Sequence, residues 1–302
     1  MAVVVAFLAN IAVAIAKTAA ALLTGSASLV AEALHSWADA GNEVFLLIAE
    51  RSGRRMRDRS HPLGYGREVY FWSLFAAFGL FTVGAVLSVA TGVQELLDPE
   101  PVTDYLVGYL VLAVAAVLEG VSLAQSLRQV RRDSAAVDRE AVDYVLNGSD
   151  ATLRAVVFED VAALVGLALA GASLALHQLT GEAFFDGLGS ILIGVLLAVV
   201  AVLLIQRNRR FLVGEVPPAA VHRAVLTQLL LHPVIARVTF LHLEFVGPGR
   251  LLLIAAVDLV DDDPESIAAI RLRRLADDIQ RRDRVEVAAL TLALPDEPSL
   301  EP

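Results

Sequence analysis

The residues most able to do chemistry in this chain interrupt an otherwise apolar segment, residues 27–50. His35 and Asp39 stand one helical turn apart in the middle of it, so on a helix an imidazole nitrogen and a carboxylate oxygen would lie side by side. Such a pair supplies two of the ligands that a divalent transition metal such as zinc requires. The wider polar set has spacings of three and four and therefore shares one helix face: Glu32, His35, Ser36, Asp39, Asn42 and Glu43.

The composition places this polar stripe inside a membrane. The chain has 302 residues, of which 57% are hydrophobic, and a mean hydropathy of +0.65, which is too apolar for an ordinary soluble domain. An ionisable side chain in the middle of a bilayer costs at least about 2.5 kcal/mol, so a row of them must face a bundle interior or a water-filled cavity. We therefore interpret the stripe as the lining of a site or a path. The alternative is a polar pair that only fixes helix packing.

The second half of a metal site is expected in the apolar segment 151–176, which carries Glu159 and Asp160. Neighbouring residues lie about 100° apart on a helix, so one of the two is expected to be a ligand and the other a proton or second-layer partner. Together, His35, Asp39 and Asp160, with Glu159 or a water, would complete a four-coordinate site. This requires the second and fifth apolar segments to touch. Cysteine is absent, so any metal site must use His, Asp and Glu.

Every ligand of this set can take up a proton, so protons compete with the metal for the same lone pairs. This competition is a physical basis for metal/proton exchange, and the His35 imidazole titrates nearest to working pH. A metallo-hydrolase is disfavoured because there is no His-Glu-x-x-His motif and no serine with a matching base. An organic-cation transporter would favour an aromatic-lined cavity. A metal sensor or scaffold that does not transport remains an alternative. With a net charge of −10 and no long basic run, nothing indicates nucleic acid binding.

Six apolar segments are long enough to span a bilayer: 2–23, 27–50, 70–97, 105–127, 151–176 and 184–205. Arginines gather in the connections after the second and fourth segments and after the sixth, whereas the other three connections contain no lysine or arginine. By the positive-inside rule, both termini are cytoplasmic, and we expect a multi-pass protein of the cytoplasmic (inner) membrane. Lys17, the only lysine, is either a counter-charge to the acidic stripe or a snorkelling residue near the end of a span.

The composition changes to that of a soluble domain at Phe211. The predicted elements are a helix that starts at Val216-Pro217-Pro218 and runs to about Leu231, strands at 234–245 and 250–260, a helix at 264–279 and a strand at 285–294. The sequence therefore predicts a six-helix transmembrane bundle in residues 1–210 and a small α+β (α-β-β-α-β) cytoplasmic domain in residues 211–302. A domain of about 85 residues has a marginal core, so we expect it to form a homodimer.

Several motifs, in this order, resemble the cation diffusion facilitator family of divalent-metal transporters. They are Ala31-Glu32-Ala33-Leu34-His35-Ser36-x-x-Asp39, the loop His61-Pro62-Leu63-Gly64-Tyr65-Gly66-Arg67, Asp160, Asp186 and the tail around His242. The resemblance covers essentially the whole chain. It implies a homodimer, not an enzyme, that exports a divalent cation from the cytoplasm by alternating access, usually against protons, and that needs no organic cofactor. Its membrane site carries over to His35, Asp39 and Asp160.

The chain departs from that family in two places. Members with two His-x-x-x-Asp pairs have a histidine where this chain has Val156, and Glu159 would substitute for it. Zn²⁺ is then the expected ion, with Mn²⁺, Fe²⁺ or Co²⁺ favoured as oxygen ligands replace nitrogen; a Glu-Asp pair in the fifth span resembles the zinc-transporter-like branch. In the cytoplasmic domain, Ala256 stands where another histidine is expected. The candidate cytoplasmic ligands are His61, His222, His232, His242, Glu244 and Asp258.

Overall fold

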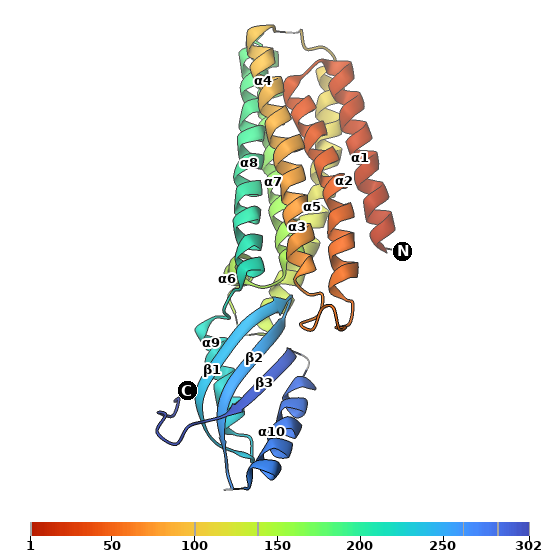
Figure 1. Ribbon diagram of the computed structural model, residues 1–302. Coiled ribbons are helices and arrows are strands. Elements are labelled where there is room, and N and C mark those ends of the chain that lie inside the picture. Colours follow the sequence, from red (N-terminus) through yellow and green to blue (C-terminus); the bar gives the residue numbers. More distant parts are fainter. Residues whose placement is uncertain (1, 100, 138, 262, 283, 302) are drawn as a thin grey trace. The chain divides into compact units, whose positions relative to one another are not determined.

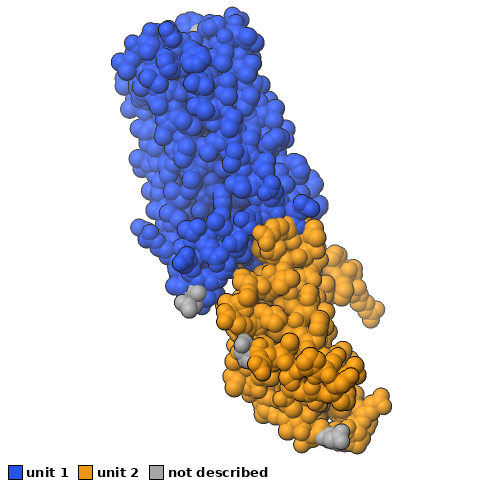
Figure 2. All heavy atoms as spheres, turned by 90° about the vertical axis from the view of Figure 1, so that its left-hand side faces the viewer, with its two compact units in different colours: residues 1–50, 71–209 blue, residues 51–70, 210–302 orange. Residues whose placement is uncertain are grey.

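The computed structural model describes residues 2–99, 101–137, 139–261, 263–282 and 284–301, except the side chains of residues 2–6, 8 and 9. The chain divides into two compact units, which Figure 2 colours separately. Unit 1 consists of Met1–Glu50 and Phe71–Arg209, and unit 2 consists of Arg51–Tyr70 and Arg210–Pro302.

The helices of unit 1 run alongside one another in Figure 1. They are α1 (Ala2–Thr24), α2 (Ala27–Gly53), α3 (Glu68–Gly79), the π-helix η1 (Leu80–Val86), α4 (Leu87–Leu97), α5 (Tyr105–Ala135), α6 (Ala141–Asn147), α7 (Ala151–Thr180) and α8 (Phe184–Val213). The elements α3, η1 and α4 join end to end into one continuous helix. The predicted starts of α2, α5, α7 and α8 are confirmed. The ends of these helices lie beyond the predicted ones because the helices continue past their apolar segments into stretches with charged or polar residues.

Four helices of unit 1 are long and apolar enough to cross a membrane: Glu68–Leu97, Tyr105–Ala135, Ala151–Thr180 and Phe184–Val213. The apolar stretch described in α1, Asn10–Thr24, is shorter, and α2 carries the polar stripe. Burial in this unit is inverted relative to a soluble protein. Lys17, Glu32 and His35 are fully buried, whereas the aliphatic side chains of Val114 and Val117 are 61% and 67% exposed. This pattern fits a bundle whose outer surface faces lipid.

The carboxylate of Asp186, in the first turn of α8, clamps the start of α2. Its Oδ1 accepts hydrogen bonds from Ser26 Oγ (2.8 Å) and Ser28 Oγ (2.5 Å), and its Oδ2 accepts one from the backbone N–H of Ala27 (2.5 Å). The first N–H groups of a helix lack partners within the helix and carry partial positive charge, so a carboxylate from another helix stabilises them. Asp186, identified above only as part of a family motif, thus fixes one end of α2 to α8.

Two glycines allow the continuous helix 68–97 and α8 to approach closely. A Cβ added to Gly92 would lie 2.5 Å from the carbonyl oxygen of Gly187, and one added to Gly194 would lie 2.8 Å from that of Ala85. No side chain fits in these gaps, and small residues are the usual means by which membrane helices pack backbone to backbone. The two helices therefore form a tightly packed pair within unit 1.

The C-terminal part of unit 2 contains α9 (Ala219–Leu230), β1 (Ile235–Gly247), β2 (Arg250–Leu259), α10 (Glu265–Gln280) and β3 (Val285–Leu292). The sheet order is β1-β2-β3, with β1 and β2 antiparallel and β2 and β3 parallel. The predicted α-β-β-α-β order is confirmed. Leu226 of α9 and Leu275 of α10 share a core with the alternating residues Leu253, Ala255 and Val257 of β2. Both helices therefore pack on the same face of the sheet.

The arginine-rich loop between α2 and α3 is part of unit 2 and docks on its sheet. Arg57 donates hydrogen bonds to the carbonyl oxygen of Glu286 (3.2 Å) and to Gln280 Oε1 (3.3 Å). Arg67 forms an ion pair with Glu244, which lies 177 positions further along the chain. A boundary drawn from composition alone does not group this loop with the sheet, because nothing local in the loop's sequence identifies partners so distant in the chain.

Gly66 is the point of closest approach between this loop and the sheet. A Cβ at residue 66 would lie 2.5 Å from the carbonyl oxygen of Val246 and 2.7 Å from Cα of Gly247. We expect Gly66→Ala to displace the loop at a cost of about 1–3 kcal/mol, because backbone atoms on β1 cannot give way as a flexible side chain would. Limited trypsin digestion measures this, since a displaced loop exposes its arginines and is cut faster.

Gly120→Ala is the matched control for this substitution. A Cβ at Gly120 in α5 meets no atom within 4 Å, and alanine is the better helix former. Its digestion rate should equal that of the wild type. Equal rates for both variants would show that the loop does not depend on the close approach at Gly66.

Candidate cation site

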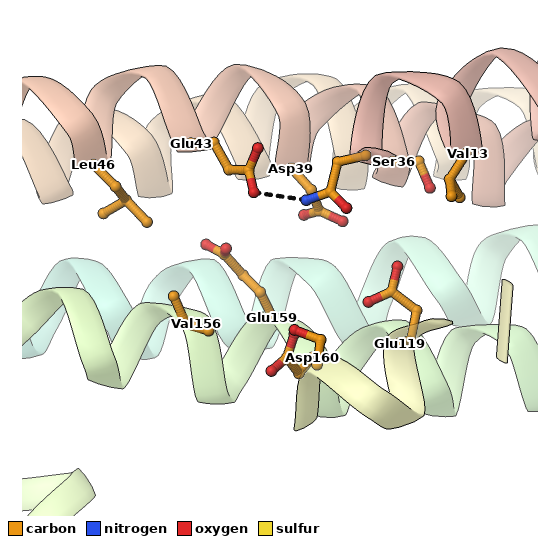
Figure 3. Close-up of a pocket in the computed structure, with 11 residues that line it drawn as sticks. Val13, Ser36, Asp39, Glu43, Leu46, Glu119, Val156, Glu159 and Asp160 are labelled. Carbon is orange, nitrogen blue, oxygen red and sulfur yellow. Dashed lines mark hydrogen bonds between the residues drawn. The ribbon is translucent and has the colours of Figure 1, made fainter. Parts of the chain in front are cut away.

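A cavity of about 80 Å³ lies inside unit 1, between α1, α2, α5 and α7. It is lined by Asn10, Val13, Ser36, Asp39, Glu43, Leu46, Glu119, Ser122, Val156, Glu159 and Asp160. Five of these side chains are carboxylates, and none is a lysine, arginine or histidine. In Figure 3, Glu119 and Glu159 reach across the cavity toward the side on which Asp39 and Glu43 lie. A space walled by converging carboxylates is suited to a cation.

His35 and Asp39 form the predicted pair on α2, but only Asp39 lines the cavity. His35 is fully buried, and its Nδ1 lies 3.3 Å from Asp39 Oδ2. The one-turn spacing thus brings the imidazole and the carboxylate together, as expected for positions i and i+4. For both side chains to hold one ion, the ion would have to lie beside Asp39, within reach of the imidazole.

Asp160 on α7 lines the cavity and is held by two serines of α5. Ser122 Oγ donates to its Oδ1 and Ser126 Oγ donates to its Oδ2, each over 2.9 Å. Hydroxyl donors on both oxygens fix the orientation of the carboxylate and stabilise its charged form. Ser122 and Ser126 therefore orient the aspartate in the way that residues around a metal site orient its ligands.

Glu159 brings the second and fifth apolar segments together. Asn42 of α2 donates a hydrogen bond to Glu159 Oε1, and both Glu159 and Asp160 line the same cavity as Asp39. The contact that the predicted site required between α2 and α7 is therefore confirmed. Although Glu159 and Asp160 are neighbours on α7, both carboxylates reach the cavity.

Several residues at the cavity are absent from the predicted ligand set: Asn10, Glu43, Glu119 and Ser122 line it, and Ser126 contacts Asp160 from outside the lining. Asn10 Nδ2 donates to Glu43 Oε1 over 2.7 Å. A sequence signal for the α5 residues exists, since positions 119, 122 and 126 are spaced by three and four and share one helix face. These residues reach the site only because α5 packs against α7. No local sequence pattern predicts that packing.

Lys17 of α1 is the counter-charge to the polar stripe, which confirms one of the two interpretations of this residue. Its Nζ lies 2.9 Å from Glu32 Oε2, and both side chains are fully buried. The other oxygen of Glu32 lies against Gly166 of α7, at a position where any Cβ would collide with it. The ion pair thus joins α1 to α2 at the surface of α7, one turn from His35.

No three His, Asp and Glu side chains of the described residues lie close enough together to hold a metal ion. The cavity carboxylates instead face one another across a gap with room for a partly hydrated cation, since one water needs roughly 10–15 Å³ of such space. Val156, where the family resemblance implies a histidine in some members, lines the cavity as an aliphatic residue. The ligand set His35, Asp39, Asp160 and Glu159 stays a prediction.

The candidate ligands of the C-terminal domain have separate surroundings in unit 2. His242 Nε2 lies 3.6 Å from Glu244 Oε2, whereas Asp258 pairs with Arg237 (3.0 Å). His222 Nε2 lies 3.2 Å from the carbonyl oxygen of Leu241, and His232 Nδ1 accepts a hydrogen bond from the backbone of Val234. The structure therefore brings together only one pair of the six.

His61, the loop candidate, stacks on Tyr65 with 3.9 Å between the ring centroids. The neighbouring carboxylate of Asp58 accepts hydrogen bonds from Ser60, from Tyr65 and from the backbone of His61. These bonds hold the pKa of the Asp58 carboxyl well below its usual range. The carboxylate thus stabilises the turn of the loop as long as the pH stays above the ordinary pKa of an aspartate.

Residues 3–213 match the family model of the cation efflux transmembrane domain. The chain belongs to the cation efflux family. The sequence-based identification of a zinc-transporter-like cation diffusion facilitator is therefore confirmed. Cation efflux is transport rather than catalysis, and the matched domain is an integral membrane domain.

Several curated proteins are similar to this cation efflux chain. Metal tolerance protein C4 of Arabidopsis thaliana is 36% identical over 230 residues, which are 76% of this chain and 50% of that protein. The Xenopus laevis protein named proton-coupled zinc antiporter SLC30A9, mitochondrial, is 38% identical over 215 residues, 71% of this chain and 38% of that protein. Cation-efflux pump FieF of Escherichia coli K12 is 31% identical over 132 residues, 42% of this chain. The chain spans half or less of the length of these relatives.

Proposed function

We propose that the chain is an efflux transporter for a divalent cation, above all Zn²⁺, which works by alternating access and exchanges the metal for protons. The observation that carries this proposal is the cavity in which carboxylates of α2, α5 and α7 converge inside a cation efflux domain. The name of the Xenopus relative, a proton-coupled zinc antiporter, supports both the ion and the coupling.

The transported ion is held by Asp39 and Asp160, with His35 and Glu159 as further ligands. Each of these groups binds either the metal or a proton, so protonation from one side of the membrane releases the metal there. Only His35 supplies a nitrogen, whereas the cavity walls offer oxygen. This balance favours Zn²⁺ when His35 takes part, and Mn²⁺, Fe²⁺ or Co²⁺ when it does not.

The proposed protein crosses the cytoplasmic (inner) membrane six times. Both of its termini then lie on the cytoplasmic side. Four helices meet the requirements of length and apolarity, and α1 and α2 complete the set because their polar residues are buried inside the bundle. The arginine-rich connections after the second and fourth spans then lie on the cytoplasmic side. The division into a transport domain, residues 1–210, and a cytoplasmic domain, residues 211–302, belongs to the same proposal.

A homodimer is supported by the face of the sheet that α9 and α10 leave uncovered. Phe240 is 52% exposed on this face, and the half-buried cross-strand pair of His242 and Ile254 continues the surface onto β2. An uncovered, largely apolar sheet face on a domain of this size is stabilised by a second copy of itself.

Uptake into proteoliposomes that contain the purified full-length protein tests the proposed function. Zn²⁺, Mn²⁺, Fe²⁺ and Co²⁺ are compared with and without a pH gradient. Saturable uptake that depends on the gradient is expected, fastest for Zn²⁺. If folded, dimeric protein moves none of the ions, the chain is a metal sensor or scaffold and the transport proposal is wrong.

A further inference from the structure

Two carboxylates face the cavity without belonging to the predicted ligand set. Glu43 of α2 has one oxygen bound by Asn10 (2.7 Å), and its Oε2 is buried without a partner among the described residues. Glu119 of α5 makes no hydrogen bond or ion pair with any residue that the structure describes. Figure 3 shows its carboxylate pointing into the cavity, away from its own helix. Among the carboxylates of this cavity, Glu119 is therefore the one whose oxygens are most available to bind a ligand.

The negative charge of the carboxylates around Glu119 is not balanced by a basic side chain among the residues that line the cavity. All ionisable residues that line the cavity are acids, and Lys17 is engaged with Glu32 at 2.9 Å and does not line it. Carboxylates that face each other in a poorly hydrated space are stabilised either by protons or by a bound cation between them. A divalent cation that Glu119 can reach would therefore exchange with protons at this cluster.

Ser36 provides an independent sign of a ligand at this end of the cavity. Its side chain is 4% exposed, and its Oγ has no hydrogen-bond partner among the described residues. Figure 3 shows the hydroxyl on the α2 side of the cavity, opposite the carboxylate of Glu119. A buried hydroxyl without a partner is unfavourable, and its oxygen lone pairs can be satisfied by a cation or by its bound water.

We propose that Glu119 is a ligand of the transported divalent cation, supplied by α5, and that Ser36 and Asp39 face the same ion from α2. This inference rests on the proposed function. The ion would then be held by three helices, since Asp160 of α7 is already oriented by the serines of α5. Glu119 adds an oxygen donor, so it would help to set the preference between Zn²⁺ and Mn²⁺.

Metal binding by the purified full-length protein, measured by titration calorimetry with Zn²⁺ and with Mn²⁺, tests this role. Glu119→Gln should weaken binding of both ions at least about tenfold, because an amide oxygen is a much poorer ligand than a carboxylate. Glu119→His should raise the ratio of Zn²⁺ to Mn²⁺ affinity, because it exchanges an oxygen donor for nitrogen. Glu95→Gln, a buried carboxylate of α4 outside the cavity, is the matched control and should bind like the wild type.

The outcomes separate this inference from the proposed function. Wild-type affinity in Glu119→Gln, or weaker binding in both Glu119 variants with an unchanged Zn²⁺ to Mn²⁺ ratio, would overturn the ligand role and leave the transport proposal standing. A wild-type protein that binds neither ion would overturn the transport proposal itself.

Discussion

Asp39→Ala is expected to reduce cation transport to the background rate of empty liposomes. Asp39 is the one predicted ligand that both lines the cavity and contacts His35, so its loss removes one donor and leaves the imidazole without its partner. Every transported ion would lose the same ligand, so the transport rate of each ion should fall. Zn²⁺ uptake into proteoliposomes under a pH gradient measures the effect.

Asp160→Ala should abolish uptake in the same assay, because it removes a ligand that Ser122 and Ser126 hold in place. Asp98→Ala is the matched control: this aspartate is exposed at the end of α4, away from the cavity, and its replacement should leave uptake unchanged. Size-exclusion chromatography establishes that each variant is folded and elutes at the same volume as the wild type. Normal transport by either cavity variant would show that the ion follows another route.

Lys17→Met is expected to destabilise the folded protein by about 3–5 kcal/mol, since it leaves the Glu32 carboxylate buried without its partner. Such a loss lowers the midpoint of thermal unfolding by on the order of 10 °C for a chain of this size. The midpoint can be followed in detergent by tryptophan fluorescence. The double variant Lys17→Met/Glu32→Leu should recover most of the loss, because two apolar residues need no compensation in this setting.

Arg132→Met is the control for the removal of a cation. Arg132 is 81% exposed and its side chain pairs with the neighbouring Asp133, so its replacement should change stability by no more than about 0.5 kcal/mol. If Lys17→Met unfolds at the wild-type temperature, the buried carboxylate does not depend on the lysine. If the double variant is less stable than Lys17→Met alone, the pair is not the source of the loss.

The sequence predicted most elements of this fold because their patterns are local. Apolar segments of sufficient length mark the helices, and the alternation around Leu253 and Val257 marks a strand with one covered face. The polar stripe of α2 likewise predicted that Asp39 would face the interior, since spacing alone places it there. The ion pair of Lys17 with the stripe was one of the two interpretations of this lysine. It was predicted because a buried charge is stabilised by a charge of opposite sign.

What the sequence did not predict depends on contacts between distant segments. Glu119 and Ser122 join the site only because α5 packs on α7, and Arg67 meets Glu244 only because the loop docks on β1. The π-helical turn at residues 80–86 is a further example. It widens the helix by one residue per turn, and no residue type in Leu-Phe-Thr-Val-Gly-Ala-Val specifies it.

The hydrogen bonds of Asp186 to the start of α2 give that helix a hinge point. Asp39 lies 12 positions beyond Ala27, or about 18 Å along the helix axis, so a tilt of roughly 10° about the fixed end would carry it sideways by about 3 Å. That displacement is comparable to the diameter of the one water molecule that would separate a metal ion from a carboxylate. A small swing of α2, with its clamped end still, would therefore suffice to draw the opposing carboxylates onto a dehydrated ion or to release it.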